Sequence, residues 1–101
     1  MEINLVVNDF DLTTEQAKTI RDKFEAKLDR LISNYAPDVK EATMTITKRT
    51  RWGYKLKFTM TLPKNEYIHA DAVSDSFETG LVDLREKIES QIKKYKDEIR
   101  T

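Results

Sequence analysis

Basic side chains are the main candidates for chemistry in this chain, because the residues that usually carry catalysis are scarce. The sequence has no cysteine, two glycines and a single histidine, His69. A lone imidazole without a thiol or a second histidine forms neither a usual zinc site nor a nucleophile relay. Two glycines are too few for a glycine-rich phosphate loop. We therefore expect no enzyme activity, no catalytic residue, no metal, no cofactor and no small-molecule substrate.

A basic turn forms the first candidate binding site. Residues 48–57 contain five cations and no acidic residue, and Arg49, Arg51 and Trp52 lie at its centre. Cations beside an exposed aromatic ring suit phosphate contact together with stacking on a base or sugar. The alternative is a positively charged turn whose Trp52 folds back on the sheet edge.

Two segments of helical periodicity carry the other candidate cations. Their charged faces interleave basic and acidic residues, so each is either a salt-bridged solvent face, with ion pairs such as Glu89 with Lys93, or a face that presents cations to phosphates. The first segment carries Lys23, Lys27 and Arg30. The second segment has a stripe of apolar residues along one side. One flank of this stripe carries Arg85, Lys93, Lys96 and Arg100, and the other flank carries Lys87 and Lys94.

The apolar spacings of three and four that define these helices run from Ala17 to Tyr35 and from Phe77 to Ile99. Thr13 with Gln16 forms a capping box, and Pro37 stops the first helix at or before Ala36. For the second helix we expect Ser74 or Asp75 as the N-cap, with Glu78 completing an acidic capping box. Gly80 lies inside this helix, at a cost of about 1 kcal/mol relative to alanine, which indicates a close approach to a neighbouring element.

Elsewhere the apolar period is two, which predicts four strands. A first strand covers Met1 to Val7, a second alternates through Ala42, Met44 and Ile46, and a third alternates from Tyr54 to Leu62. Pro63, Lys64 and Asn65 then turn the chain into a short last strand, Glu66 to Ala72. Its inward residues are Ile68, Ala70 and Ala72, which leaves Tyr67, His69 and Asp71 facing solvent.

The element order β-α-β-β-β-α predicts an α+β fold in a single domain, residues 1–101. The first strand is expected to lie parallel to the second, and the following hairpins to be antiparallel. The resulting four-stranded mixed sheet has one apolar face. Both helices carry one apolar stripe, so the economical packing is a two-layer sandwich with both helices on that face and the other face open to water.

Composition limits the partners. The chain has 18 basic and 18 acidic residues, a formal net charge of +0, which disfavours a general polyanion binder but permits a local basic face. No apolar run approaches the roughly 20 residues that span a bilayer, and no signal peptide is evident. Together with the absence of cysteine, this predicts a cytoplasmic protein without a membrane partner.

The segment from Ile68 to Arg100 resembles the carboxy-terminal signature of the short ribosome hibernation-promoting factors, a family also called ribosome-associated inhibitor or protein Y. The family's Ile-His-Ala strand end matches Ile68, His69 and Ala70, and part of its Ser-Asp-Asp turn matches Ser74 and Asp75. Its helical Lys-Leu-x-x-Gln-Leu-x-Lys-x-Lys core matches Lys87, Ile88, Gln91, Ile92, Lys94 and Lys96. A first-helix Glu-Lys-Leu segment is similar to Glu25, Lys27 and Leu28. The sequence departs from the pattern at Ser76, Glu78, Val82 and Ser90.

This resemblance implies a translation inhibitor that binds the small ribosomal subunit and its rRNA, and that sterically blocks the decoding region where mRNA and tRNA bind. It implies RNA contacts from Lys87, Lys94 and Lys96, with Arg85, Lys93 and Arg100 beside them. Off the ribosome the chain is expected to be monomeric. The alternative is a non-catalytic protein-interaction module of the same fold, which recruits a partner through the open sheet face or an edge strand and has no nucleic-acid partner.

Overall fold

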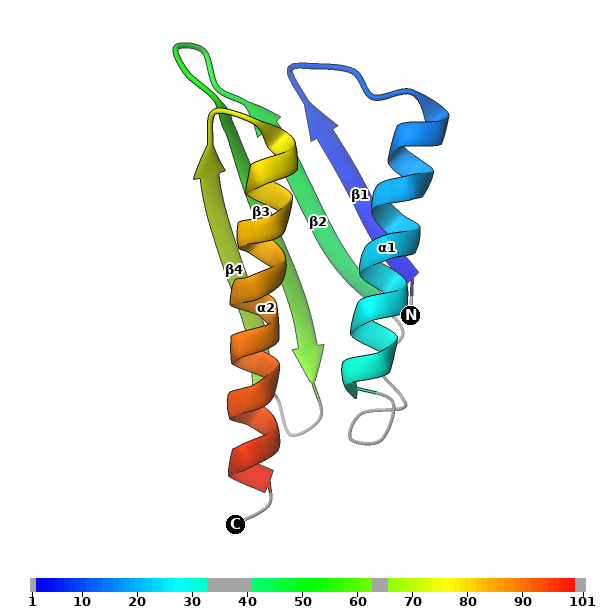
Figure 1. The fold of residues 1–101 in the computed structure, drawn as a ribbon, viewed down its shortest axis with the longest axis vertical. Helices are drawn as coiled ribbons and strands as arrows, with labels where there is room; N and C mark the ends of the chain where they lie inside the picture. The colour runs from blue at the N-terminus through cyan, green and yellow to red at the C-terminus, as the bar shows by residue number, and fades with distance from the viewer. Residues whose placement is uncertain (1, 33–40, 63–65, 100–101) are drawn as a thin grey trace.

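The alternating segments of the sequence form one four-stranded sheet in the computed structural model of the protein, which describes residues 2–32, 41–62 and 66–99. The strands lie in the order β1-β2-β3-β4, with β1 parallel to β2 and the other two pairs antiparallel (Figure 1). This confirms the predicted mixed sheet. The strands are β1 (Glu2–Asn8), β2 (Glu41–Lys48), β3 (Tyr54–Leu62) and β4 (Glu66–Ser74).

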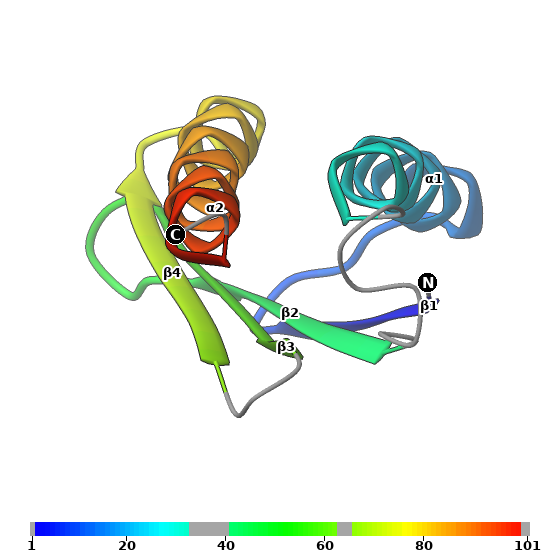
Figure 2. The ribbon, with the colours of Figure 1, turned by 90° about the horizontal axis from the view of Figure 1, so that it is seen from below.

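The two helices, α1 (Thr14–Ile32) and α2 (Phe77–Ile99), lie on the same face of the sheet (Figure 2). They run in the same direction, with α1 on the β1 side and α2 on the side of β3 and β4 (Figure 1). The predicted two-layer α+β sandwich is therefore confirmed. No helix within the described residues is both long enough and apolar enough to cross a membrane.

The core lies between these two layers. It contains the stripe of each helix and the inward residues of the strands, including Met44, Ile46, Leu56 and Phe58, all at 0% exposure. Fully burying one such side chain stabilises the fold by about 1.5–3 kcal/mol. The helical residues in the core are Ile20, Phe24, Leu28, Ile32, Leu84, Ile88, Ile92 and Tyr95. Burial of these stripes fixes the rotation of each helix, and with it the direction in which its charged flanks point.

Helix α1 begins with the predicted capping box. The Thr13 hydroxyl accepts a hydrogen bond from the Gln16 backbone N–H at 3.0 Å, and the Gln16 side chain accepts one from the Thr13 backbone N–H at 2.9 Å. The predicted stop at Pro37 lies outside the described residues. So does the turn predicted at residues 63–65.

Helix α2 begins one or two residues later than predicted, and the N-cap assigned to Ser74 or Asp75 is wrong. Ser76 is the N-cap, because its hydroxyl accepts from the Thr79 backbone N–H at 3.4 Å and its carbonyl accepts from the Gly80 N–H at 3.0 Å. Strand β4 extends to Ser74, which pairs with Tyr54, so Ser74 is still part of the sheet. The strand was predicted to end at Ala72.

Glycine is required at two close approaches. A Cβ at Gly80 would lie 2.5 Å from Cδ1 of the buried Leu56, which confirms the predicted close approach to a neighbouring element and identifies that element as the sheet. Gly53, at φ +69°, ends the turn between β2 and β3, and a Cβ there would collide with the carbonyl oxygen of Ser74. The β2–β3 turn is thereby seated against the junction of β4 with α2.

Candidate nucleic-acid interface

The predicted cations of α1 all lie on its flank toward α2. Lys23, Lys27 and Arg30 are spaced by four and three residues, so they share one side of the helix. The direction of that side is shown by Lys27, whose Nζ lies 3.6 Å from Oε1 of Glu89 on α2. The opposite flank of α1, with Glu25, faces β1.

Three cations of α2 lie on the flank that faces α1. Arg85, Lys93 and Lys96 share the side of the helix that carries Glu89, and Arg85 Nε lies 3.6 Å from Glu89 Oε1. Arg100, predicted on the same flank, lies outside the described residues. The two helices therefore turn their cation-bearing flanks toward each other across the surface. We name this surface the interhelical strip, and it consists of Lys23, Lys27, Arg30, Arg85, Lys93 and Lys96.

A groove of about 600 Å³ separates the amino-terminal halves of the helices at one end of this strip. Lys23 and Arg85 line it from opposite helices, as do the acidic Glu15 and Glu78. Its apolar lining comes from Ile20, Phe24, Phe77, Leu81 and Val82. Two predicted site residues that are 62 positions apart in the sequence are thus brought to the same depression.

Glu89 is the carboxylate in the middle of the strip. It pairs with Lys27 and Arg85 rather than with Lys93, the partner that the sequence suggested. The side chains of Lys27, Arg85 and Glu89 are 41%, 46% and 32% exposed, so solvent screens these ion pairs and each contributes about 0–1 kcal/mol to stability. The six cations of the strip therefore surround one central carboxylate, Glu89, and two more carboxylates, Glu15 and Glu78, line the groove at its end.

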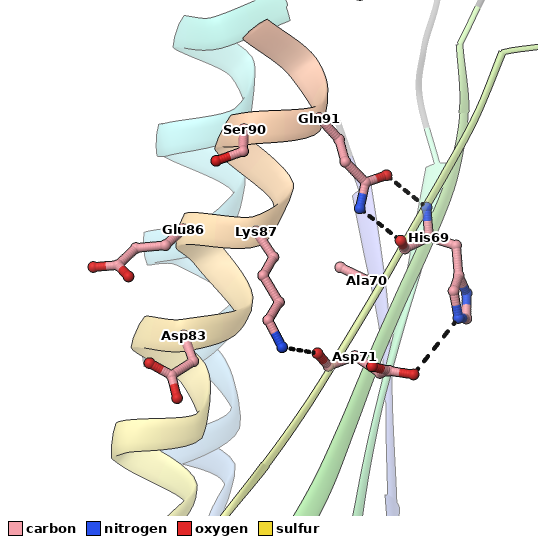
Figure 3. Close-up of a pocket in the computed structure, with 8 residues that line it drawn as sticks. All are labelled: His69, Ala70, Asp71, Asp83, Glu86, Lys87, Ser90 and Gln91. Atoms are coloured by element: carbon pink, nitrogen blue, oxygen red, sulfur yellow. Dashed lines mark hydrogen bonds and ion pairs between the residues drawn. The ribbon is translucent and has the colours of Figure 1, made fainter. Parts of the chain in front are cut away.

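The opposite flank of α2 binds the outer edge of β4 (Figure 3). Lys87 Nζ donates a hydrogen bond to the Asp71 carbonyl at 2.7 Å, and the Gln91 amide bonds the backbone of His69. Lys94 follows Lys87 by seven residues, two helical turns, and shares this flank. The three cations matched to the family motif are therefore divided, because Lys96 lies in the interhelical strip whereas Lys87 and Lys94 do not.

The other edge of the sheet is also bound by a helix. The Glu25 carboxylate of α1 accepts a hydrogen bond from the Ile3 backbone N–H of β1 at 3.0 Å. Four backbone groups that an added strand would need are therefore already occupied: the N–H and carbonyl of His69, the carbonyl of Asp71 and the N–H of Ile3. Sequence reasoning missed both edge contacts; the one signal was the position of Gln91 beside the buried stripe.

The basic turn between β2 and β3 presents its side chains to solvent. Arg49 and Arg51 are exposed, and Trp52 is 54% exposed, so the indole does not pack away against the sheet edge. The Arg49 N–H donates to the Gly53 carbonyl at 2.9 Å, which closes the turn. Beside it, the rings of Phe10, Tyr54 and Phe77 form a cluster with centroids 5.1–6.2 Å apart that the sequence did not reveal. Tyr54 meets both phenylalanine rings edge-on.

Histidine and carboxylates form no metal-binding group within the described part of the chain. His69 Nε2 lies 3.9 Å from Asp71 Oδ2, and both side chains are about half exposed, in agreement with the predicted solvent-facing side of β4. The fold and this surface together define a small two-layer sandwich with a cation-rich strip between its helices.

Comparison with known families identifies the chain. Residues 3–100 match the family described as sigma 54 modulation protein / S30EA ribosomal protein, and the chain belongs to that family. The resemblance to the ribosome hibernation-promoting factors is thereby confirmed. A search of curated proteins found no match.

Among solved structures, the fold is similar to that of the Thermus thermophilus Protein Y N-terminal domain. The two share 15% sequence identity with a TM-score of 0.74, and the match covers 94% of this chain and 99% of that one. At this identity the likeness concerns the fold. The two-layer arrangement of sheet and helices is therefore shared by a distant sequence.

Proposed function

We propose that this chain is a ribosome-binding translation inhibitor that places its interhelical strip against rRNA of the small ribosomal subunit. Membership of the S30EA ribosomal protein family supports ribosome association. The observation that carries the finer assignment is the facing pair of flanks, where Lys23, Lys27 and Arg30 meet Arg85, Lys93 and Lys96.

Phosphate binding is the chemistry that this surface suits. Each cation that neutralises a phosphate releases a condensed counterion, so several contacts together give strong but salt-dependent binding. The strip's groove adds an apolar lining beside Lys23 and Arg85. A chain of zero net charge can bind RNA in this way only through local sorting of charge, and the strip supplies that sorting.

Inhibition requires no chemical step in this proposal. The protein occupies the decoding region, where mRNA and tRNA would otherwise bind, and acts by steric exclusion. A two-layer sandwich with a continuous core suits this role, because a close-packed interior has low compressibility. We accordingly infer a non-enzymatic protein that acts in the cytoplasm, where ribosomes work.

Association through a strand edge is less favoured as the basis of function. Side chains of the helices bind the N–H and carbonyl of His69 and the carbonyl of Asp71 on β4, and the N–H of Ile3 on β1. A partner strand would first have to displace these contacts. Recruitment of a protein partner through either edge at these positions therefore carries a cost that binding through the strip does not.

Co-sedimentation with purified small subunits across a salt series tests the proposal. We expect the logarithm of the binding constant to fall linearly with the logarithm of salt concentration, with a slope of about −0.7 to −0.9 per neutralised phosphate. Binding that is absent, or that does not change with salt, would overturn the assignment.

A matched pair of variants on α1 locates the contact. Lys23→Gln removes a strip cation, whereas Lys18→Gln removes an exposed cation that lies away from α2. The first should reduce the salt slope by about one phosphate contact, and the second should leave it unchanged. Equal effects of the two variants would show that the strip is not the binding surface.

A further inference from the structure

The open face of the sheet carries a pair of parallel aromatic rings. Tyr67 and His69 alternate along β4, so both point away from the helices. Their ring centroids are 6.2 Å apart and their planes differ by 10°. Tyr67 is 59% exposed and the His69 side chain is 48% exposed, so both rings are available to a ligand.

The spacing of these rings follows from the strand. Two residues span about 6.8 Å along an antiparallel strand, and stacked nucleobases repeat at about 3.4 Å. The distance between the two ring centroids is thus close to twice the distance between stacked bases. Small rotations of two exposed side chains, which occur on the picosecond to nanosecond scale, adjust such a pair to a flat ring placed against it.

Strand β3 provides polar and cationic groups beside the rings. Thr61 pairs with Tyr67 and Thr59 pairs with His69, so their hydroxyl groups lie on the same face. Lys57 pairs with Asp71 and is therefore a diagonal neighbour of His69, within reach of a long side chain. The nearest carboxylate is Asp71. Glu41 lies on β2, the strand next to β3, at the level of Thr61, and Glu2 lies beyond it on β1.

We propose that Tyr67 and His69 form a stacking site for one unpaired RNA base, with Lys57 contacting the adjacent phosphate and the two threonines near the ribose. Sequence-tolerant stacking on aromatic side chains beside cations is a general mode of single-strand recognition. This inference rests on the proposed function in that both take RNA as the partner. It adds a second contact surface, on the side of the sheet opposite the interhelical strip.

An NMR titration with an eight-nucleotide oligo(A) RNA tests the site. The ring resonances of Tyr67 and His69 should shift on addition of the RNA. Tyr67→Ala should weaken binding by about 5- to 150-fold, and Tyr67→Phe should restore it because the ring face is retained. An abasic backbone of the same length should bind less tightly than oligo(A) and should be insensitive to Tyr67→Ala.

Val73→Ala provides the matched control, because Val73 is 45% exposed on the same face and lies beyond the ring pair. It should not change the affinity for oligo(A). Unchanged binding by Tyr67→Ala, or equal affinity for the abasic backbone, would overturn the stacking site.

The same variants separate this proposal from the first. If Lys23→Gln weakens small-subunit binding while Tyr67→Ala leaves oligo(A) binding intact, only the stacking site fails. If oligo(A) binding depends on Tyr67 while Lys23→Gln and Lys18→Gln act equally on the subunit, the proposed function of the strip fails instead.

Discussion

Gln91 binds both backbone hydrogen-bonding groups of His69 with one side chain. Its Oε1 accepts from the His69 N–H at 3.2 Å, and its Nε2 donates to the His69 carbonyl at 2.6 Å (Figure 3). Both residues belong to the segments that resemble the hibernation-factor signature. Within this chain, that part of the signature docks α2 on the outer edge of β4, and Lys87 extends the docking to Asp71.

Loss of the Gln91 amide should destabilise the fold. We expect Gln91→Ala to lower the free energy of unfolding by about 1–2 kcal/mol, because two hydrogen bonds of about 0.5–1.5 kcal/mol each are lost. Urea denaturation measures this change. The neighbouring Ser90→Ala, at an exposed position, should stay within about 0.5 kcal/mol of the native protein. Equal stability of the two variants would contradict a docking role for Gln91.

Removal of the carboxylate at Glu89 should strengthen ribosome binding. Glu89→Gln frees Lys27 and Arg85 from their ion pairs, which are each worth up to about 1 kcal/mol. We expect tighter association with small subunits, by about two- to five-fold at constant salt, and a change in the free energy of unfolding below about 1 kcal/mol. Co-sedimentation gives the affinity and urea denaturation the stability. Weaker association would indicate that the ion pairs hold the surface in its binding shape.

Adjacent lysines on α2 should behave differently. Lys93 lies in the interhelical strip, whereas Lys94 lies on the flank of Lys87, although Lys94 is the residue matched to the family motif. Lys93→Gln should reduce the salt slope of small-subunit binding by about 0.7–0.9, the contribution of one phosphate. Lys94→Gln should have the smaller effect. The reverse order would place the RNA contact on the β4 side of the helix.

Alanine at Gly80 should destabilise the protein despite its better helix propensity. The propensity gain is about 1 kcal/mol, but the new Cβ would lie 2.5 Å from Leu56 Cδ1 in a side chain at 0% exposure. Overpacking of this kind costs about 1–3 kcal/mol. Combined with Leu56→Ala, the loss should be smaller than the sum of the two single losses, with a coupling of about 0.5–3 kcal/mol. Additive losses in urea denaturation would show that Leu56 does not meet the new methyl group.

The sequence predicts most of this fold because its periods are clear. Apolar spacings of three and four mark the helices, and a spacing of two marks the strands. The order β-α-β-β-β-α then leaves few arrangements in which every element buries its apolar face. The sequence does not decide at which residue α2 begins, because Ser74, Asp75 and Ser76 are all residue types that can act as an N-cap. The deciding fact is tertiary, since Ser74 is held in the sheet opposite Tyr54.

The candidate site was less predictable than the fold. Helical angles place Arg85 and Lys87 on different flanks, but they do not say which flank meets the other helix and which meets a strand edge. Likewise, the pairing of Glu89 with Lys27 depends on how the two helices are placed relative to each other on the sheet. No local sequence pattern encodes that placement. The side chains that bind backbone edges, Gln91 and Glu25, have no motif of their own, because their partners are peptide groups present in every sequence.

Helix side chains that contact both margins of the sheet also bear on self-association. Copies of a small mixed sheet can otherwise join strand to strand and grow into insoluble arrays. Here each margin is engaged from within the same molecule, by Gln91 and Lys87 at β4 and by Glu25 at β1. At these positions, self-association through strand pairing is therefore disfavoured relative to an edge whose backbone groups are open.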